Sequence, residues 1–179
     1  MSNRMVSESR GRLAFALACC LLLAGCFTSS QPKFPLSTAV PALGNGGHFG
    51  AYERQSDGSY KRDESFDVKH RADGGYDFTD LKGKVTPISL HRIRGDLYVA
   101  QAVNDKNDHT DYALLRVQGK DGNEILAYAP QCDKQDAAKL KALGVEIRKY
   151  ECVIDRVADP AALFAAIDIG EAGSKMVRE

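Results

Sequence analysis

Residues 85–103, VTPISLHRIRGDLYVAQAV, carry the clearest indication of the fold. Apolar and polar residues alternate in the first half of this stretch, as they do in a strand with one buried face. Gly95-Asp96 is a two-residue hairpin signal between the halves. The second half is apolar on both faces except at Gln101, so it is expected to be the most buried strand of the sheet.

Short strands continue on both sides of this hairpin. Glycine-containing turns separate runs with a period of two, which is the pattern of an antiparallel meander. The alternation slips phase near Arg92, which predicts a β-bulge there. Further strands are expected at 49–54, 60–61, 66–70, 76–78, 112–117 and 124–128. The short connections predict a sheet of about six to eight strands that curls toward a barrel.

The last third of the chain changes character. Asp133 is placed to cap a helix that ends at Gly144. One strand is expected over 145–154, and Asp159-Pro160 then begins a second helix. The fold class is therefore α+β, an antiparallel meander with two short C-terminal helices.

Residues 1–25 are organised like a secretion signal. Three arginines precede an apolar run that ends at Leu23. The run has about eleven residues, whereas a membrane-spanning helix needs roughly 20, so a cleaved signal is favoured over a transmembrane helix. Leu23-Ala24-Gly25-Cys26 closes the run and resembles a bacterial lipobox.

That resemblance implies cleavage before Cys26 and acyl chains, palmitate among them, on its sulfur and amine. Two or more chains hold a protein stably on a membrane. Bacterial lipoproteins are usually sorted outward unless aspartate follows the cysteine, and Phe27 follows it here. The resemblance therefore implies a lipoprotein of the cell envelope, on the outer membrane and facing the periplasm.

The predicted organisation has four parts. They are a signal peptide at 1–25, a lipidated tether rich in proline, serine and glycine at 26–47, one globular domain at 48–169 and a flexible tail at 170–179. The tether would be about 25 Å long as a flexible chain. The chain from Cys26 onward has 154 residues, 21 of them basic and 23 acidic. Such a balance gives no electrostatic case for nucleic acid as a partner.

Cys132 and Cys152 remain after Cys26. Three interpretations are open: a disulfide, two buried free thiols, or a metal or redox site. Export to an oxidising compartment favours the disulfide. A metal or redox site is disfavoured because there is no C-x-x-C and no histidine at ligand spacing from either cysteine.

The sequence shows no local motif for catalysis, a cofactor or a metal. There is no G-x-S-x-G elbow, no phosphate-binding G-x-G-x-x-G and no paired histidine spacing. The loop 104–109 gathers oxygen ligands but lacks the glycine and distal glutamate of a calcium loop. His70 is expected to be a core or rim histidine. We therefore predict no enzyme activity, no cofactor and no metal site.

Gly50-Ala51-Tyr52 at the first strand, followed by the meander and a late helix, resembles the lipocalins. That family encloses small ligands in a barrel and is sometimes lipid-anchored in bacteria. The family motif places tryptophan after Gly-x, and this chain contains no tryptophan. The resemblance is one of shape, which does not transfer function.

Three functional hypotheses follow. The first is a lipid-anchored envelope accessory or binding module that contacts a partner protein through a sheet face or strand edge. The second is a lipocalin-like carrier of a small apolar ligand, which requires an apolar cavity of several hundred Å³. The third is an envelope hydrolase, which requires two carboxylates with separated pKa values in a cleft.

Overall fold

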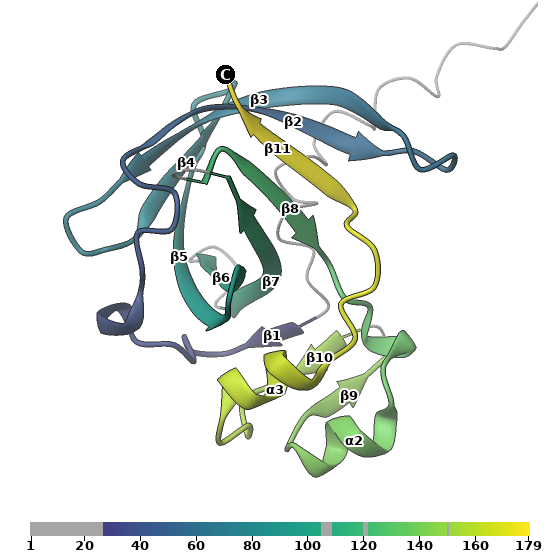
Figure 1. The fold of residues 1–179 in the computed structure, drawn as a ribbon. Coiled ribbons are helices and arrows are strands. Elements are labelled where there is room, and N and C mark those ends of the chain that lie inside the picture. Colours follow the sequence, from purple (N-terminus) through teal and green to yellow (C-terminus); the bar gives the residue numbers. More distant parts are fainter. Residues whose placement is uncertain (1–26, 105–108, 120–121, 150) are drawn as a thin grey trace, which may run out of the picture.

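A computed structural model describes residues 27–104, 109–119, 122–149 and 151–179. Eight antiparallel strands follow one another around a ring in the order β6-β5-β4-β3-β2-β11-β8-β7, and β7 pairs with β6 to close it (Figure 1). The ring strands are β2 (Gly46–Arg54), β3 (Tyr60–His70), β4 (Tyr76–Asp80), β5 (Val85–Arg94), β6 (Leu97–Asn104), β7 (His109–Gln118), β8 (Glu124–Tyr128) and β11 (Ser174–Arg178).

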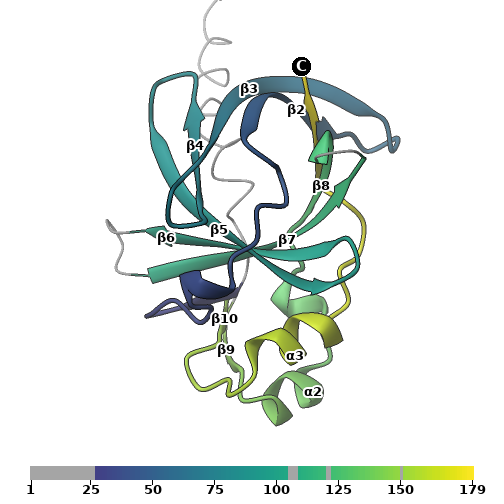
Figure 2. The same ribbon diagram turned by 60° about the vertical axis from the view of Figure 1, so that its left-hand side comes forward.

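A smaller layer covers the outside of the barrel, and its two helices lie together beneath the ring (Figure 2). The sheet of this layer begins at the outer side of β7. There β1 pairs antiparallel with β7 and parallel with β10. The remaining elements are β1 (Phe27–Ser29), η2 (Leu36–Thr38), η4 (Cys132–Lys134), α2 (Ala137–Ala142), β9 (Glu146–Arg148), β10 (Glu151–Val153) and α3 (Pro160–Ala166). Within the described ranges, no helix has the length and apolar character that crossing a membrane requires.

The barrel interior is filled by side chains. Phe49, Phe66 and Phe78 stack along neighbouring strands, with ring centroids 5.9 and 5.5 Å apart. Alanines dominate the facing wall of β6, β7 and β8, and small residues opposite large ones fill a narrow barrel. The other buried members of this interior cluster are Leu43, Val68, Tyr76, Ile88, Leu90, Ala100, Ala102, Ala113, Leu115, Ile125, Ala127 and Met176.

A second core lies between the barrel wall and the smaller layer. Leu97 and Val99 of β6, with Tyr112 and Leu114 of β7, point outward and pack against the helices. The Tyr112 ring lies 5.6 Å from that of Phe164 on α3. Residues 97–102 are all buried because β6 has a core on each face, so the prediction of a most buried strand is confirmed.

Several local predictions are confirmed. The hairpin turns at Gly95, which has a φ of 50°, and β5 shifts register between Arg92 and Arg94, where the bulge was expected. Asp159 caps α3 by accepting from the Ala162 amide, and Pro160 is the first helical residue. The predicted antiparallel meander with two helices is also correct, but the fold is largely β and the sheet closes completely.

Two boundaries in the last third differ from the predictions. The first helix begins three residues later than expected, because Asp136 rather than Asp133 accepts from the Ala138 and Lys139 amides. The single strand expected over 145–154 is a hairpin, β9 and β10, whose strands pair with each other. A turn that includes Lys149 separates the two strands, although residues 145–154 read as one continuous strand in the sequence.

Both ends of the described chain also differ from the prediction. Residues 170–179 were expected to be a flexible tail. Instead, β11 lies between β2 and β8 and pairs with both, so the ring is complete only when this strand is in place. Residues 27–47 were expected to be a tether, but they contain β1 and two buried anchors, Phe34 and Leu43. We call residues 30–45 the strap; they cross the outside of the barrel as far as Leu43, whose side chain enters the interior core.

Candidate functional site

An open groove of about 420 Å³ lies between the strap and the outer face of β5 and β6. The strap forms one wall, and the outward side chains of the two strands form the other. Leu36 and Val103 border it and are 45% and 38% exposed, which is unusual for apolar side chains of this protein. The lining residues are Pro32, Lys33, Phe34, Pro35, Leu36, Arg71, Pro87, Ile88, Ser89, Gln101 and Val103.

The strap is fixed to the barrel by the side chain of Gln101. Its amide nitrogen donates to the Phe34 carbonyl and its amide oxygen accepts from the Phe34 N–H, both at 2.9 Å. Gln101 is 3% exposed, so both bonds are shielded from water. A buried backbone group without a partner would cost about 1–3 kcal/mol. The side chain of Gln101 thus makes the two hydrogen bonds with the Phe34 backbone that a neighbouring strand would otherwise make.

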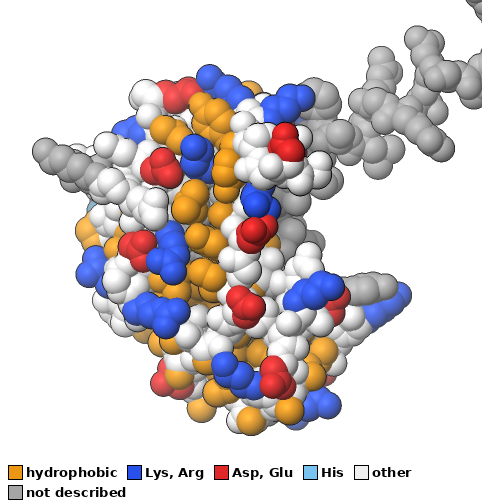
Figure 3. All heavy atoms as spheres, turned by 45° about the vertical axis from the view of Figure 1, so that its right-hand side comes forward, with side chains coloured by type: hydrophobic (Ala, Val, Ile, Leu, Met, Phe, Trp, Pro, Cys, Tyr) orange, Lys and Arg blue, Asp and Glu red, His pale blue; other side chains and the backbone are white. Residues whose placement is uncertain are grey.

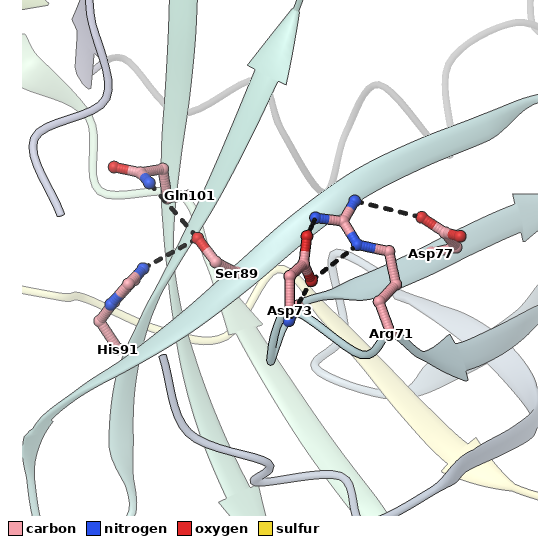
Figure 4. A network of polar contacts seen from close by, with 7 residues as sticks. Arg71, Asp73, Asp77, Ser89, His91 and Gln101 are labelled. Carbon is pink, nitrogen blue, oxygen red and sulfur yellow. Dashed lines mark hydrogen bonds and ion pairs between the residues drawn. The ribbon is translucent and has the colours of Figure 1, made fainter. Parts of the chain in front are cut away.

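A buried histidine continues this network (Figure 4). Ser89 Oγ accepts from Gln101 at 3.3 Å and lies 2.8 Å from His91 Nε2. Thr38 donates its hydroxyl proton to the Pro35 carbonyl, so it can accept at 2.9 Å from His91 Nδ1. The imidazole also stacks on the Phe34 ring, with centroids 4.9 Å apart. These partners suit a neutral imidazole whose proton is on Nδ1.

Burial of His91, which is 2% exposed, lowers the pKa of its imidazole. An unfolded chain binds a proton at this residue below about pH 6.5, while the folded protein resists protonation. We therefore expect the free energy of unfolding to fall as the pH is lowered from 7.5 toward 5. Urea unfolding at several pH values measures this, and His91→Gln should flatten the curve. An unchanged slope in His91→Gln would assign the pH dependence to other groups.

The far end of the groove holds an arginine that is already paired. Arg71 donates to Asp73 through Nε at 3.0 Å and Nη2 at 2.6 Å, and to Asp77 through Nη1 at 3.3 Å (Figure 4). The hydrogen bonds that Arg71 donates to Asp73 raise the pKa of Arg71 and lower that of Asp73. Lys33, at the other wall, donates to the Asp155 carbonyl at 2.9 Å. Both cations of the groove therefore have partners within the protein.

Behind the groove, Tyr112 fixes the beginning of the strap. Its hydroxyl lies 2.7 Å from Ser29 Oγ and accepts from the Lys33 amide at 3.0 Å. Ser29 in turn donates to the Gln31 carbonyl at 2.6 Å. Burial raises the pKa of the Tyr112 phenol, which stays protonated near neutral pH. The strap is thus held at Gln31, Lys33, Phe34 and Thr38.

The outer face of β2, β11 and β8 carries a second apolar feature. Figure 3 shows a stripe of hydrophobic side chains there, with lysine, arginine, aspartate and glutamate interspersed along both borders. Outward positions on these strands include Tyr52 and Leu126, which flank Lys175 in the register. The Lys175 ammonium lies over the Tyr52 and Tyr60 rings at 5.8 and 5.3 Å. This stripe is therefore partly covered by the protein's own cation.

Of the predicted site residues, the cysteine pair is confirmed. Cys132 and Cys152 form a disulfide with Cα atoms 5.7 Å apart, and both are buried. It joins η4 to β10 beneath the barrel. Cys26, the predicted lipidation site, lies outside the described residues, as do residues 1–25 and most of the loop 104–109.

The histidines fall in separate places, as their spacing suggested. His48 contacts Asp67 at 2.8 Å, His109 contacts Asp111 at 3.1 Å, and the His70 ring lies 5.1 Å from that of Tyr76. Among the described residues, no group of three or more histidine, cysteine, aspartate or glutamate side chains could hold a metal ion.

Sequence reasoning missed the groove because it assigned the strap to a tether. Prolines and serines suggested a chain without fixed structure, yet Phe34 is 7% exposed and Leu43 fully buried. Two large apolar residues inside a polar, proline-rich segment were the available signal. No family model, no curated protein and no solved structure matches this chain.

Proposed function

We propose that this protein is a lipid-anchored, non-enzymatic binding module of the bacterial envelope. It faces the periplasm from the outer membrane, and its groove accepts an apolar segment of a partner envelope protein. The observation that carries the proposal is the contrast between a filled barrel and an open, apolar groove outside it. Exposed apolar side chains such as Leu36 and Val103 stabilise a complex when a partner covers them.

The chemistry of the groove favours a protein segment over a small polar ligand. Gln101, Ser89, Lys33 and Arg71 line it, but their hydrogen-bonding groups already have partners. Small-molecule sites combine an apolar lining with a few polar groups that fix the ligand's orientation. This groove offers shape and apolar area, which suit side chains presented by another polypeptide.

The two other functional hypotheses are less well supported. A lipocalin-like carrier holds its ligand inside the barrel, where aromatic side chains and Leu43 occupy the space here. A hydrolase requires carboxylates at a cleft, and the groove lining contains neither aspartate nor glutamate. The barrel fold remains compatible with a binding module of either kind.

The anchor is tested by Cys26→Ala. We expect the wild-type chain to fractionate with membranes and to have an intact mass that begins at Cys26 plus acyl chains. The variant should lose both properties, because the lipid attachment requires the cysteine sulfur. Cys26→Ala protein that stayed on the membrane with an unchanged mass would refute the anchor.

The groove is tested by photocrosslinking in intact cells. A photoreactive residue at position 36 should give one crosslinked partner band. Val103→Asp should abolish it, because the complex would bury a new carboxylate while the groove's two cations, Lys33 and Arg71, already have partners within the protein. The matched control is Leu81→Asp, which alters a side chain that is 71% exposed and away from the lining. Equal loss of the band in both variants would contradict a groove-specific partner.

A further inference from the structure

The first described residue, Phe27, is already part of the folded domain. It is fully buried and pairs with Tyr112 on one side and with Cys152 on the other. Its ring meets Phe164 edge-on at a centroid distance of 5.6 Å. The domain's structure therefore begins with β1, and no flexible residues stand between Phe27 and the core.

The burial of Phe27 restricts how far the domain can lie from the proposed lipid anchor, and the inference rests on that anchor. Consecutive Cα atoms are about 3.8 Å apart, so the lipidated residue is the immediate neighbour of a buried one. A flexible tether of about 20 residues would instead leave the domain free at roughly 25 Å. We propose that the domain sits directly on the phospholipid headgroups in one fixed orientation, with the turn between β9 and β10 toward the lipid and the groove facing away.

The pairing of β1 identifies what lies at the membrane end. Because β1 and β10 are parallel, the start of β1 lies beside the start of β10, where Thr28 Oγ1 donates to Glu151 at 2.7 Å. Glu151 pairs across the β9–β10 hairpin with Arg148. The exposed turn that follows Arg148 therefore lies at the same end as the attachment point, with Lys149 in it.

The groove lies toward the other end of the same segment. The chain leaves the start of β1, crosses to Ser29 and continues along the strap to Leu36, which borders the groove. Figure 1 places the short coil η2 beyond the arrowhead of β1, away from the end at which β1 begins. With the start of β1 against the lipid, Leu36 and Val103 face the periplasmic space, where a partner can reach them.

Charge does not drive this orientation. Glu146, Arg148, Lys149 and Glu151 cancel at the membrane end, and Arg148 donates to Glu146 at 2.9 Å. A basic patch would bind anionic lipid with a strength that falls steeply with salt. Here the orientation is set by the covalent acyl chains and by the short connection between Cys26 and the buried Phe27. It should therefore not depend on ionic strength.

The test uses the acylated protein, extracted from membranes and placed in phosphatidylethanolamine–phosphatidylglycerol vesicles that contain a nitroxide-headgroup lipid. A fluorophore is attached to Lys149→Cys or, separately, to Leu36→Cys. We expect several-fold stronger quenching at 149 than at 36, in low and in high salt. A control inserts ten glycine and serine residues between Cys26 and Phe27, which should remove the difference while the acyl mass stays.

The outcomes separate the two proposals. An acylated protein with equal quenching at the two positions overturns the fixed orientation and leaves the anchor intact. Stronger quenching at 36 overturns it too and would point the groove at the lipid. A chain without acyl mass refutes the anchor, and the orientation with it. A difference that disappears in high salt would assign the contact to charge rather than to the short attachment.

Discussion

Replacing Phe66 by alanine is expected to destabilise the domain by about 3–5 kcal/mol, because it removes the middle ring of the stack inside the barrel. Phe66 is 4% exposed and lies between Phe49 and Phe78. Urea unfolding monitored by circular dichroism measures the change. Leu81→Ala, which trims a side chain that is 71% exposed, should stay within about 0.5 kcal/mol of the wild type.

The same variant also tests whether the barrel is filled. The space left by the ring is lined by apolar groups, and such cavities bind small apolar molecules. Benzene should therefore raise the melting temperature of Phe66→Ala and leave that of the wild type unchanged. A wild-type protein that benzene stabilised equally would already contain such a cavity, and the carrier hypothesis would regain support.

Removing the disulfide is expected to have the second large effect. The double variant Cys132→Ala/Cys152→Ala should lose roughly 3 kcal/mol of unfolding free energy, because the bond closes a loop of 20 residues that the unfolded chain would otherwise leave open. Alanine is preferred to serine because both positions are buried and a hydroxyl there would need a partner.

The loss should be greatest near the bond. Amide hydrogen exchange should accelerate in β10, which contains Cys152, and in β1, which pairs with it, more than in β3 and β4 on the far side of the ring. Reducing agent should reproduce the effect in the wild type and do nothing further to the double variant. Equal stability of the oxidised and reduced wild-type protein would contradict a structural role for the bond.

The ring strands other than β11 could be predicted because their information is local. Each buries one face, so a period of two around turns such as Gly95-Asp96 is sufficient to find them. β6 could also be recognised as the most buried strand, since Leu97 and Val99 are apolar and so are the residues that alternate with them, Tyr98, Ala100 and Ala102. What packs on its outer face could not be predicted, because those helices and β1 come from distant parts of the chain.

The two ends of the chain show where local information fails. In β11 only Met176 is buried, so five residues that read as a charged tail carry almost no strand pattern. In the strap, the backbone of Phe34 pairs with a side chain 67 residues away. Composition alone could not reveal either contact, because each is made with a surface that exists only after the barrel has formed.

The groove was unpredictable for the same reason. Its two walls are the strap and the outer face of β5 and β6, and the strap had been assigned to a tether. The cysteine pair could be proposed from compartment and spacing, but a groove whose lining is mostly apolar and whose two cations are paired within the protein leaves no motif in the sequence.

The position of β11 also governs how the barrel forms. This strand is the last in sequence, yet it pairs with β2, whose residues precede it by more than 120 positions. Contacts of such separation form slowly, so refolding should take milliseconds to seconds rather than microseconds. Until β11 arrives, the edges of β2 and β8 stay open and can pair with other chains. A nascent chain that has not released residues 174–178 therefore cannot complete the ring, and its open strand edges leave it exposed to aggregation until it does.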